Sequence, residues 1–232
     1  MWGSALEMWE RRMTSERRFR SIGEGGHLDS VLGQRILEMM PPSPNAGEAV
    51  DWRQVAETWG VEFPDDYRRF VEVYGLGSVE QFLTVLVPEP GRLPEGFDML
   101  SESENARLTW SDHARRRGGD QVRGRLIAWG ADAGADVLCW DASERDPNTW
   151  PVVVFRRQGY PHWTRYECGM VDFLESIFLG ELEENPLSGD DLWGKRSLKF
   201  LHQRDEEMLL AQGIDPWTGE PDPYAGMFGE GT

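Results

Sequence analysis

Residues 61–77 read Val-Glu-Phe-Pro-Asp-Asp-Tyr-Arg-Arg-Phe-Val-Glu-Val-Tyr-Gly-Leu-Gly, and the apolar run of residues 82–87 follows them and ends at Pro88. Pro64 suits the first turn of a helix, and the two acids after it complement the partial positive charge of a helix N-terminus. The apolar run before Pro88 has the length and composition of a strand. The stretch therefore predicts a helix, a tight turn and a strand.

The helix of this stretch has one apolar face, because apolar side chains recur at positions i, i+3, i+4 and i+7. Gly75 stands where a helix needs a left-handed residue to end, and Gly77 lets the chain reverse into the strand. We expect these residues to hold the fold together rather than to form a working surface. The helical positions concerned are Tyr67, Phe70, Val71 and Tyr74.

A second short helix is predicted just before this stretch. Asp51 and Gln54 resemble a capping box, Trp52, Val55, Ala56 and Trp59 repeat the helical spacing, and Gly60 follows as a stop. Residues 41–44 include three prolines and are typical of a linker. We therefore predict an N-terminal extension and linker over residues 1–48.

After Pro88 the pattern changes from helical to strand-like. Residues 98–117 predict a surface helix with a weak apolar stripe. Short β-rich runs then follow at 126–129, 137–140, 151–155 and 163–168, as in an antiparallel meander, before an amphipathic helix from Met170 that ends near Gly180. The core domain is predicted at residues 49–182. Residues 183–232, with eleven acids against four bases, are predicted to be a C-terminal extension, helical at 197–212 and then flexible.

Composition indicates a globular protein. The chain has 232 residues, of which 39% are apolar, so it can bury a core as one domain with extensions or as two small domains. No run of about 20 apolar residues predicts a membrane span, and the N-terminus lacks the apolar core of a signal peptide. We therefore expect a cytoplasmic protein without a membrane partner, whose two cysteines are reduced and buried.

The formal net charge of −17 narrows the class of partner. A protein that binds a phosphate backbone is expected to be basic on at least one face, so direct nucleic-acid binding is disfavoured. An acidic surface suits a basic protein partner and speeds encounter with it. Taken by itself, the charge is explained more simply by an acidity that keeps the protein in solution.

The order of these features resembles the SUKH superfamily, which includes the yeast Smi/Knr-type cell-wall regulators and many bacterial immunity proteins. The resemblance covers most of residues 50–182 and leaves both extensions outside. Single motifs of this kind are common, whereas their ordered combination is specific. The fold landmarks that carry it are Pro64, Tyr67, Tyr74, Gly75, Gly77, Pro88, Trp129, Trp140, Trp150 and Pro151.

The resemblance implies an α+β fold in which a mixed or largely antiparallel sheet packs against several helices. It also implies a protein-binding module without catalytic residues or cofactor, since many bacterial members neutralise a secreted toxin, often a nuclease. Two alternatives remain. One is a regulator that binds endogenous partners through its extensions, and the other is a hydrolase that uses acids with His162 or His113.

The candidate protein-binding residues lie in the C-terminal extension, where acids and tryptophans stand in polar sequence. Exposed tryptophans can anchor a protein interface, although a tryptophan in such a segment can equally fold back onto its own domain. Adjacent acids on a helix point in different directions, so they do not form a catalytic pair. The candidates are Asp190, Asp191, Trp193, Asp205, Glu206, Glu207 and Trp217.

Other site patterns are weak. The four histidines are scattered and no zinc motif occurs, so no metal site is expected. Asp132, Asp136 and Asp141 do not match a calcium loop, and we expect them to be solvated at turns and strand ends. Cys168 and His162 could form a nucleophile pair, but a buried thiol at a strand end is the simpler interpretation. The basic cluster at residues 115–117 suits a helix end.

Overall fold

The computed structural model describes residues 33–43, 45–89, 93, 96–117 and 125–223, with the side chains of 114–117 left out. The predictions for residues 1–32, including His27, lie outside this part of the chain. The helices within it are α2 (Gln34–Met39), α3 (Trp52–Trp59), α4 (Asp65–Val73), α5 (Met99–Arg117), α6 (Met170–Leu179) and α7 (Gln203–Ala211), with a 3-10 turn at Pro147–Thr149. The strands are β1 (Gly77–Val79), β2 (Leu83–Val85), β3 (Leu126–Asp132), β4 (Val137–Asp141), β5 (Val152–Phe155), β6 (Trp163–Tyr166) and β7 (Phe200–His202).

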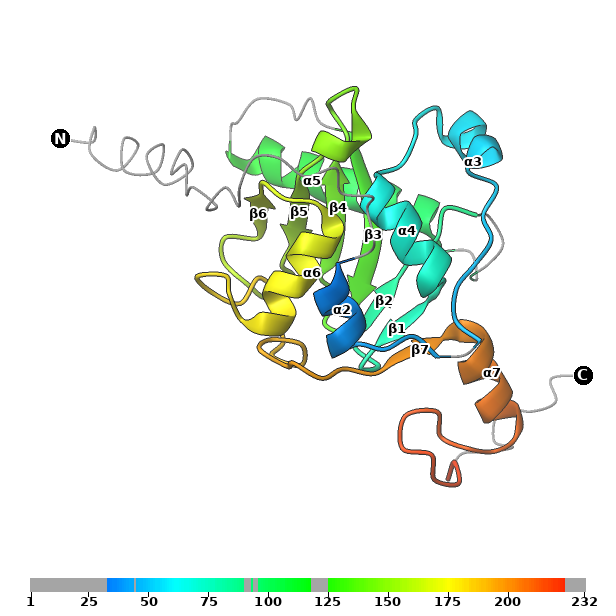
Figure 1. Ribbon diagram of the computed structural model, residues 1–232. Coiled ribbons are helices and arrows are strands. Elements are labelled where there is room, and N and C mark those ends of the chain that lie inside the picture. The colour runs from blue at the N-terminus through cyan, green and yellow to red at the C-terminus, as the bar shows by residue number, and fades with distance from the viewer. Residues whose placement is uncertain (1–32, 44, 90–92, 94–95, 118–124, 224–232) are drawn as a thin grey trace, which may run out of the picture.

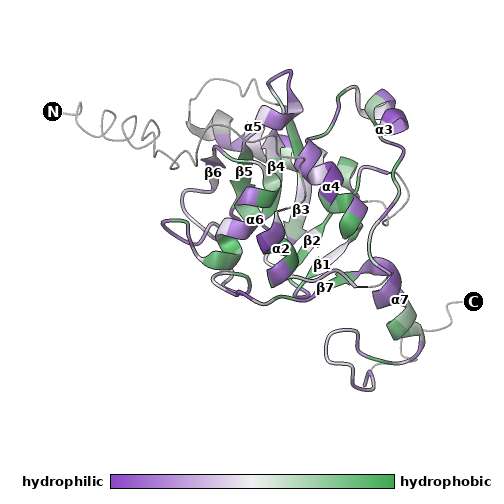
Figure 2. Ribbon diagram, viewed as in Figure 1, coloured by the Kyte–Doolittle hydropathy of each residue, from purple (hydrophilic) through white to green (hydrophobic). Residues whose placement is uncertain are grey.

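All seven strands form one antiparallel sheet in the order β6-β5-β4-β3-β2-β1-β7. Figure 1 shows α2, α4 and α6 over one face of the sheet and α5 over the other, with α3 and α7 at its margins. Figure 2 shows hydrophobic residues concentrated along the central strands and in the last turn of α7. The predicted α+β class with a largely antiparallel sheet is confirmed. Among the described residues, no helix is long and apolar enough to cross a membrane.

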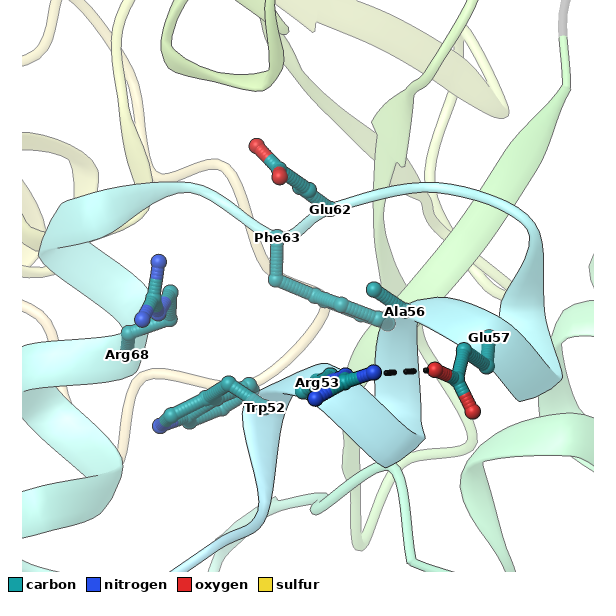
Figure 3. A pocket seen from close by; sticks show the side chains of 7 residues that line it. All are labelled: Trp52, Arg53, Ala56, Glu57, Glu62, Phe63 and Arg68. Carbon is teal, nitrogen blue, oxygen red and sulfur yellow. Dashed lines mark ion pairs between the residues drawn. The ribbon is translucent and has the colours of Figure 1, made fainter.

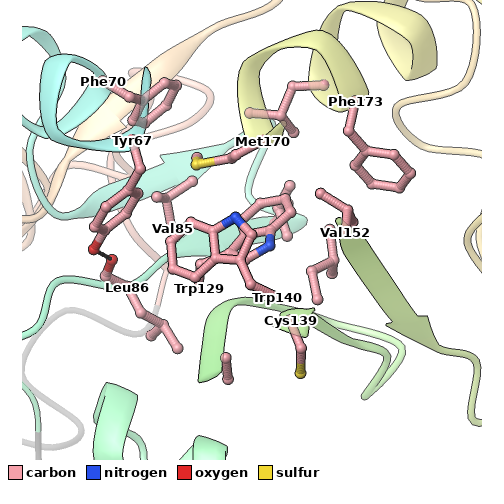
Figure 4. Close-up of a cluster of buried hydrophobic side chains, with 14 of the residues drawn as sticks. Tyr67, Phe70, Val85, Leu86, Trp129, Cys139, Trp140, Val152, Met170 and Phe173 are labelled. Carbon is pink, nitrogen blue, oxygen red and sulfur yellow. Dashed lines mark hydrogen bonds between the residues drawn. The ribbon is translucent and has the colours of Figure 1, made fainter. Parts of the chain in front are cut away.

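The predicted helix of the opening stretch is confirmed as α4, and its apolar face lies in the core. Tyr67, Phe70 and Tyr74 have no exposed surface. The Tyr67 hydroxyl donates a hydrogen bond to the carbonyl oxygen of Leu86 at 2.6 Å (Figure 4), and burial raises the pKa of this phenol well above its ordinary value. The Tyr74 hydroxyl donates to the Met40 carbonyl oxygen at 2.5 Å. Both tyrosines thus join α4 to segments on either side of it in sequence.

The two glycines after α4 have different roles. Gly75 has a φ of +74°, the left-handed conformation expected at a helix end, and a Cβ there would lie 2.6 Å from Nε2 of His202. Gly77 has no positive φ, but a Cβ on it would lie 2.3 Å from the Leu201 carbonyl oxygen. Gly77 therefore allows strand β7 to lie close against β1. The sequence predicts only that Gly77 lets the chain reverse into a strand, and it does not reveal this contact.

One strand was predicted at residues 82–87, whereas the structure contains a hairpin. β1 and β2 pair with Ser78 opposite Thr84, and residues Glu80 and Gln81 form the turn with φ of +54° and +59°. Two non-glycine residues in a left-handed turn are uncommon, because their Cβ atoms crowd the following carbonyl oxygen. The conformation is supported by Glu80, whose Oε1 accepts a hydrogen bond from the Lys199 amide at 2.5 Å.

Tryptophans fill the core between the sheet and α4 and α6. Trp129 and Trp140 are fully buried, with ring centroids 6.1 Å apart, and Tyr67 packs edge-on to Trp140 at 4.9 Å (Figure 4). Trp129 is the extra residue of a β-bulge in β3, between Ala128, which pairs with Cys139, and Gly130, which pairs with Leu138. Trp150, also buried, donates from Nε1 to the Glu144 carbonyl oxygen at 2.7 Å.

The core extends beyond the predicted boundaries of residues 49 and 182. From the N-terminal side, Ile36 and Met40 are fully buried, and from the C-terminal side β7 pairs with β1 at the sheet edge. The predicted helix at residues 197–212 is wrong in its first part, because residues 200–202 are this strand and α7 begins at Gln203. The buried side chains contributed by the C-terminal segment include Leu187, Leu192, Leu198, Phe200 and Leu201.

Candidate protein-binding surfaces

Asp136 anchors part of the C-terminal segment to the sheet. It lies at the β3–β4 turn with no exposed surface, and its carboxylate accepts hydrogen bonds from the Ser188 amide at 2.6 Å and the Ser188 hydroxyl at 2.8 Å. It also accepts from the Arg157 amide at 2.7 Å. The expectation that Asp136 is solvated at a turn is therefore wrong. Three backbone and hydroxyl donors compensate the burial of its charge.

Asp132 lies beside Asp136, and the charged form of its carboxyl group is disfavoured in the folded protein. Its Oδ1 accepts a hydrogen bond from the Asp136 amide at 2.8 Å, while its buried Oδ2 has no hydrogen-bond partner. Burial, followed by the nearby charges of Asp136 and Asp191, raises the pKa of Asp132 to about 6. Burial is thus the main reason why the charged form of Asp132 is disfavoured, and the two neighbouring acids add to it.

Three of the predicted binding residues lie in the loop that Asp136 anchors. Asp190 and Asp191 are exposed, and Asp190 accepts a hydrogen bond from the Asn185 side chain at 2.9 Å. Trp193 is half-buried and packs against the core, so it follows the alternative in which the tryptophan folds back onto its own domain. Of this group, only the two acids are exposed.

The other candidates lie on α7 and after it. Asp205 is buried and accepts hydrogen bonds from Ser43 Oγ at 2.9 Å and Asn45 Nδ2 at 3.3 Å, so it ties α7 to the N-terminal linker. Its proposed role in binding a partner conflicts with this burial. Glu207 is exposed and Glu206 is half-buried. Trp217 is half-buried, with Lys199 Nζ 5.3 Å from its ring centroid and Glu206 3.5 Å from its Nε1.

The structure separates these two groups of candidates. The loop with Asp190 and Asp191 lies at the lower left of Figure 1, whereas α7 extends from the lower right corner. They do not form a single continuous site, because β7 and the residues before it cross the base of the molecule between them. The sequence does not reveal that the two groups are separated, because the path of the chain between them depends on the pairing of β7 with β1.

A surface hollow between α3 and the start of α4 was not identified from the sequence. It has a volume of about 470 Å³, and Trp52 and Phe63 form its apolar walls (Figure 3). The Arg68 guanidinium carbon lies 5.4 Å from the Trp52 ring centroid, and Arg53 pairs with Glu57 at 3.4 Å. A second hollow of about 510 Å³ lies on the other side of Trp52. Charges of both signs line the first hollow, so it has no clear preference for one ligand charge.

The proposed nucleophile pair is not assembled. His162 precedes β6 and Cys168 follows it, so the four residues of this strand, about 13 Å of extended chain, separate them. Burial raises the pKa of the Cys168 thiol to about 12, with further contributions from Asp172 and Asp66. A thiol of this kind is protonated at neutral pH and is a poor nucleophile.

His113 and His162 do lie together, which the sequence does not suggest. Their ring centroids are 5.0 Å apart, and both rings contact Phe155. His162 Nδ1 lies 2.8 Å from the Arg156 carbonyl oxygen, so in the neutral ring this nitrogen donates. Within the described residues, no group of three or more His, Cys, Asp or Glu side chains could hold a metal ion. The basic cluster of the sequence comprises residues 115–117 with Arg123 and Arg125 nearby, and among these only Arg125 has a described side chain. Its guanidinium donates a hydrogen bond to the Trp59 carbonyl oxygen.

Comparison with known proteins identifies a family whose matched residues include all of the fold landmarks. The model of the family described as SMI1-KNR4 cell-wall, SUKH_6, matches residues 50–174. Neither a curated protein nor a solved structure matches the chain. The matched residues run from the start of α3 into α6 and leave out α2, β7 and α7. Since they make up more than half of its 232 residues, the chain belongs to the SMI1-KNR4 cell-wall family of the SUKH superfamily.

Proposed function

We propose that this protein is a cytoplasmic, non-enzymatic binding module that neutralises a basic toxin domain. Membership of the SUKH superfamily supports a protein-binding role, and the net charge of −17 supports a basic partner. Immunity to a toxin needs no chemistry from the protein itself. It requires only that a bound surface keeps the substrate out of the toxin's active site.

The proposed mechanism is electrostatic and steric. Exposed carboxylates such as Asp190, Asp191 and Glu207 attract a basic surface over a long range and raise the rate of encounter. The hydrogen bonds of Asp136 hold the loop with Asp190 and Asp191 against the sheet, and those of Asp205 tie α7, which carries Glu207, to the N-terminal linker. A partner therefore meets a preorganised surface, which lowers the entropic cost of binding.

The test is binding and rescue with the purified toxin domain encoded by a neighbouring gene. We expect tight binding that weakens as salt rises, together with survival of cells that co-express the two proteins. The combined change of Asp190, Asp191 and Glu207 to Lys should lower the association rate by about tenfold at low salt. Glu207→Lys alone and Glu144→Lys, at another exposed acid near the Trp150 turn, change the charge equally, and Glu144→Lys should have the smaller effect.

Absence of binding to every toxin encoded nearby, with no rescue, would contradict the proposal. The alternative of a regulator that binds through its extension predicts a different pattern. If the contacts lie in residues 213–232 of that extension, a chain ending at Gln212 loses binding to its endogenous partner although its fold is intact. Under the toxin proposal the same chain still protects the cell.

A further inference from the structure

The outward face of α5 carries apolar side chains that nothing in the described structure covers. Leu100 and Leu108 are each 60% exposed, and Phe97, three residues before Leu100, is 68% exposed. These are three of the six large apolar side chains that are exposed in the described part of the chain. Leu100, Glu104 and Leu108 follow each other at intervals of four residues, so they form one line along the helix. We call Phe97, Leu100, Glu104 and Leu108 the α5 ridge.

The ridge is not needed to hold α5 on the sheet. The opposite face of the helix is buried through Met99, Ser103 and Ala106. There the Ser103 hydroxyl donates to the Met99 carbonyl oxygen at 2.6 Å and accepts from the Ala128 amide of β3 at 2.9 Å. Apolar residues on both faces also explain why the sequence predicts only a weak stripe. Several large apolar side chains exposed on one face of a well-anchored helix are typical of a protein-binding site.

The position of Glu104 selects the kind of partner. It lies between the two leucines and is exposed, so a partner that covers them must also cover its carboxylate. Covering an unpaired charge is costly, and a lysine or arginine placed opposite reduces that cost. Over the whole of α5 the acids Glu102, Glu104 and Asp112 are balanced by Arg107 and by the arginines at positions 115–117, so the preference for a cation comes from Glu104, which lies between the two leucines. A second copy of the chain fits poorly, because each copy carries a net charge of −17.

We propose that the α5 ridge docks into an apolar groove of a basic protein, where a lysine or arginine pairs with Glu104. That this basic protein is the toxin domain rests on the proposed function. The binding surface and its preference for a cation are argued from α5 alone. The binding mode is that of a helix in a groove, in which apolar side chains on one face anchor the complex. Leu100 and Leu108 are the anchors, and Glu104 supplies the preference for a cation.

The ridge can be tested without the natural partner by a synthetic amphipathic helical peptide built only of leucine and lysine. We expect the labelled peptide to bind the full chain, and the double variant Leu100→Asp/Leu108→Asp to bind it at least about tenfold more weakly. This variant gains two negative charges, so general attraction of a cationic peptide would predict tighter binding. Glu104→Gln should also weaken binding and reduce its dependence on salt.

The matched control is Met208→Asp/Leu210→Asp in α7, where each side chain is 47% exposed. It adds the same charge to another exposed apolar surface and should not weaken binding. Thermal unfolding would confirm that both variants are folded. Equal or tighter peptide binding by the ridge variant, or self-association of the wild type that the ridge variant abolishes, would overturn the proposal. The toxin domain then separates the two proposals: if it binds wild type and ridge variant equally, the ridge is refuted and the toxin-binding function stands.

Discussion

Gly75 is constrained both by its own backbone and by a residue 127 positions later in the chain. Its φ of +74° is strained for any residue with a Cβ, and that Cβ would lie 2.6 Å from Nε2 of His202. The imidazole cannot easily move, since it is fully buried and its Nδ1 accepts a hydrogen bond from the Arg204 amide at 3.0 Å. The family landmark therefore fits against the C-terminal segment that the family model does not cover.

Replacing Gly75 by alanine should cost about 2–5 kcal/mol of unfolding free energy, from backbone strain plus the clash with His202. Gly60→Ala is the matched control, because Gly60 has a φ of +68° and nothing within 4 Å of its Cβ position. It should cost only about 1 kcal/mol. Denaturant unfolding of both variants measures the difference. Equal losses would show that His202 does not restrict position 75.

The carboxyl group of Asp132 should make stability depend on pH. Its pKa is about 6 in the folded protein and 3.8 in the unfolded chain, so the folded state binds the proton more tightly. The stabilisation linked to this group is fully present below pH 4 and is lost as the pH rises through 6. At neutral pH the charged group therefore opposes folding.

Asp132→Asn should accordingly stabilise the protein at pH 8, by roughly 1 kcal/mol after allowance for solvent screening. The amide oxygen can still accept from the Asp136 amide, and the amide nitrogen replaces the unpartnered, buried Oδ2. The stability difference between variant and wild type should shrink as the pH is lowered toward 4. A difference that is constant from pH 4 to 8 would contradict the raised pKa.

At the scale of elements, the β-bulge in β3 joins the two layers of the molecule. The bulge turns Trp129 toward Phe173 of α6, at a ring-centroid distance of 6.3 Å. The adjacent amide of Ala128 donates to Ser103 on α5, on the other face of the sheet. A single serine thus supplies the acceptor for a buried backbone donor next to the bulge.

Ser103→Ala should destabilise the protein by about 1–3 kcal/mol, because the buried Ala128 amide loses its acceptor. Ser101→Ala is the control: Ser101 is half-buried, and its hydroxyl bonds only to the Asp98 side chain. It should cost about 0.5 kcal/mol or less. Chemical denaturation measures both, and amide exchange at Ala128 should quicken only in the first variant. Unchanged exchange there would contradict this role of Ser103.

At the scale of the whole molecule, the end of the folded unit differs from the end of the family match. A chain that ends at residue 182 lacks strand β7 and four fully or nearly buried core residues, Leu187, Leu192, Leu198 and Phe200. At roughly 1.5–3 kcal/mol each, their loss is comparable with the total stability of a typical domain. We expect this chain not to unfold cooperatively.

A chain that ends at Gln212 keeps β7 and the Asp205 contacts, and it should unfold cooperatively within a few degrees of the full-length protein. Calorimetry of the two chains distinguishes these outcomes. If the shorter chain also unfolds cooperatively at a similar temperature, β7 is dispensable. Deleting the whole C-terminal extension, residues 183–232, is therefore unsuitable for testing whether that extension binds a partner, because the deletion also removes part of the core.

Local chemistry determined much of this protein from sequence alone. The face of α4, the cap of Asp51 on α3, the left-handed Gly60 and Gly180, and the meander of β3 to β6 all follow from interactions within a few residues. The ordered landmarks also led to the SUKH superfamily. These signals are readable because helix periodicity, capping and turns depend on neighbours in the chain.

Only the tertiary structure decided the rest, because it depends on contacts between distant residues. The strands β1 and β7 have three residues each and are defined by their pairing with other strands. Asp136 and Asp205 read as solvent-exposed acids, yet Ser188 and Ser43 supply the donors that allow their burial. Leu100, with Ala106 and Trp110, belongs to the weak apolar stripe that the sequence predicts for residues 98–117, yet Leu100 is exposed and its neighbour Met99 enters the core. Burial of a side chain is set by what packs over it, and the sequence around that residue does not contain this information.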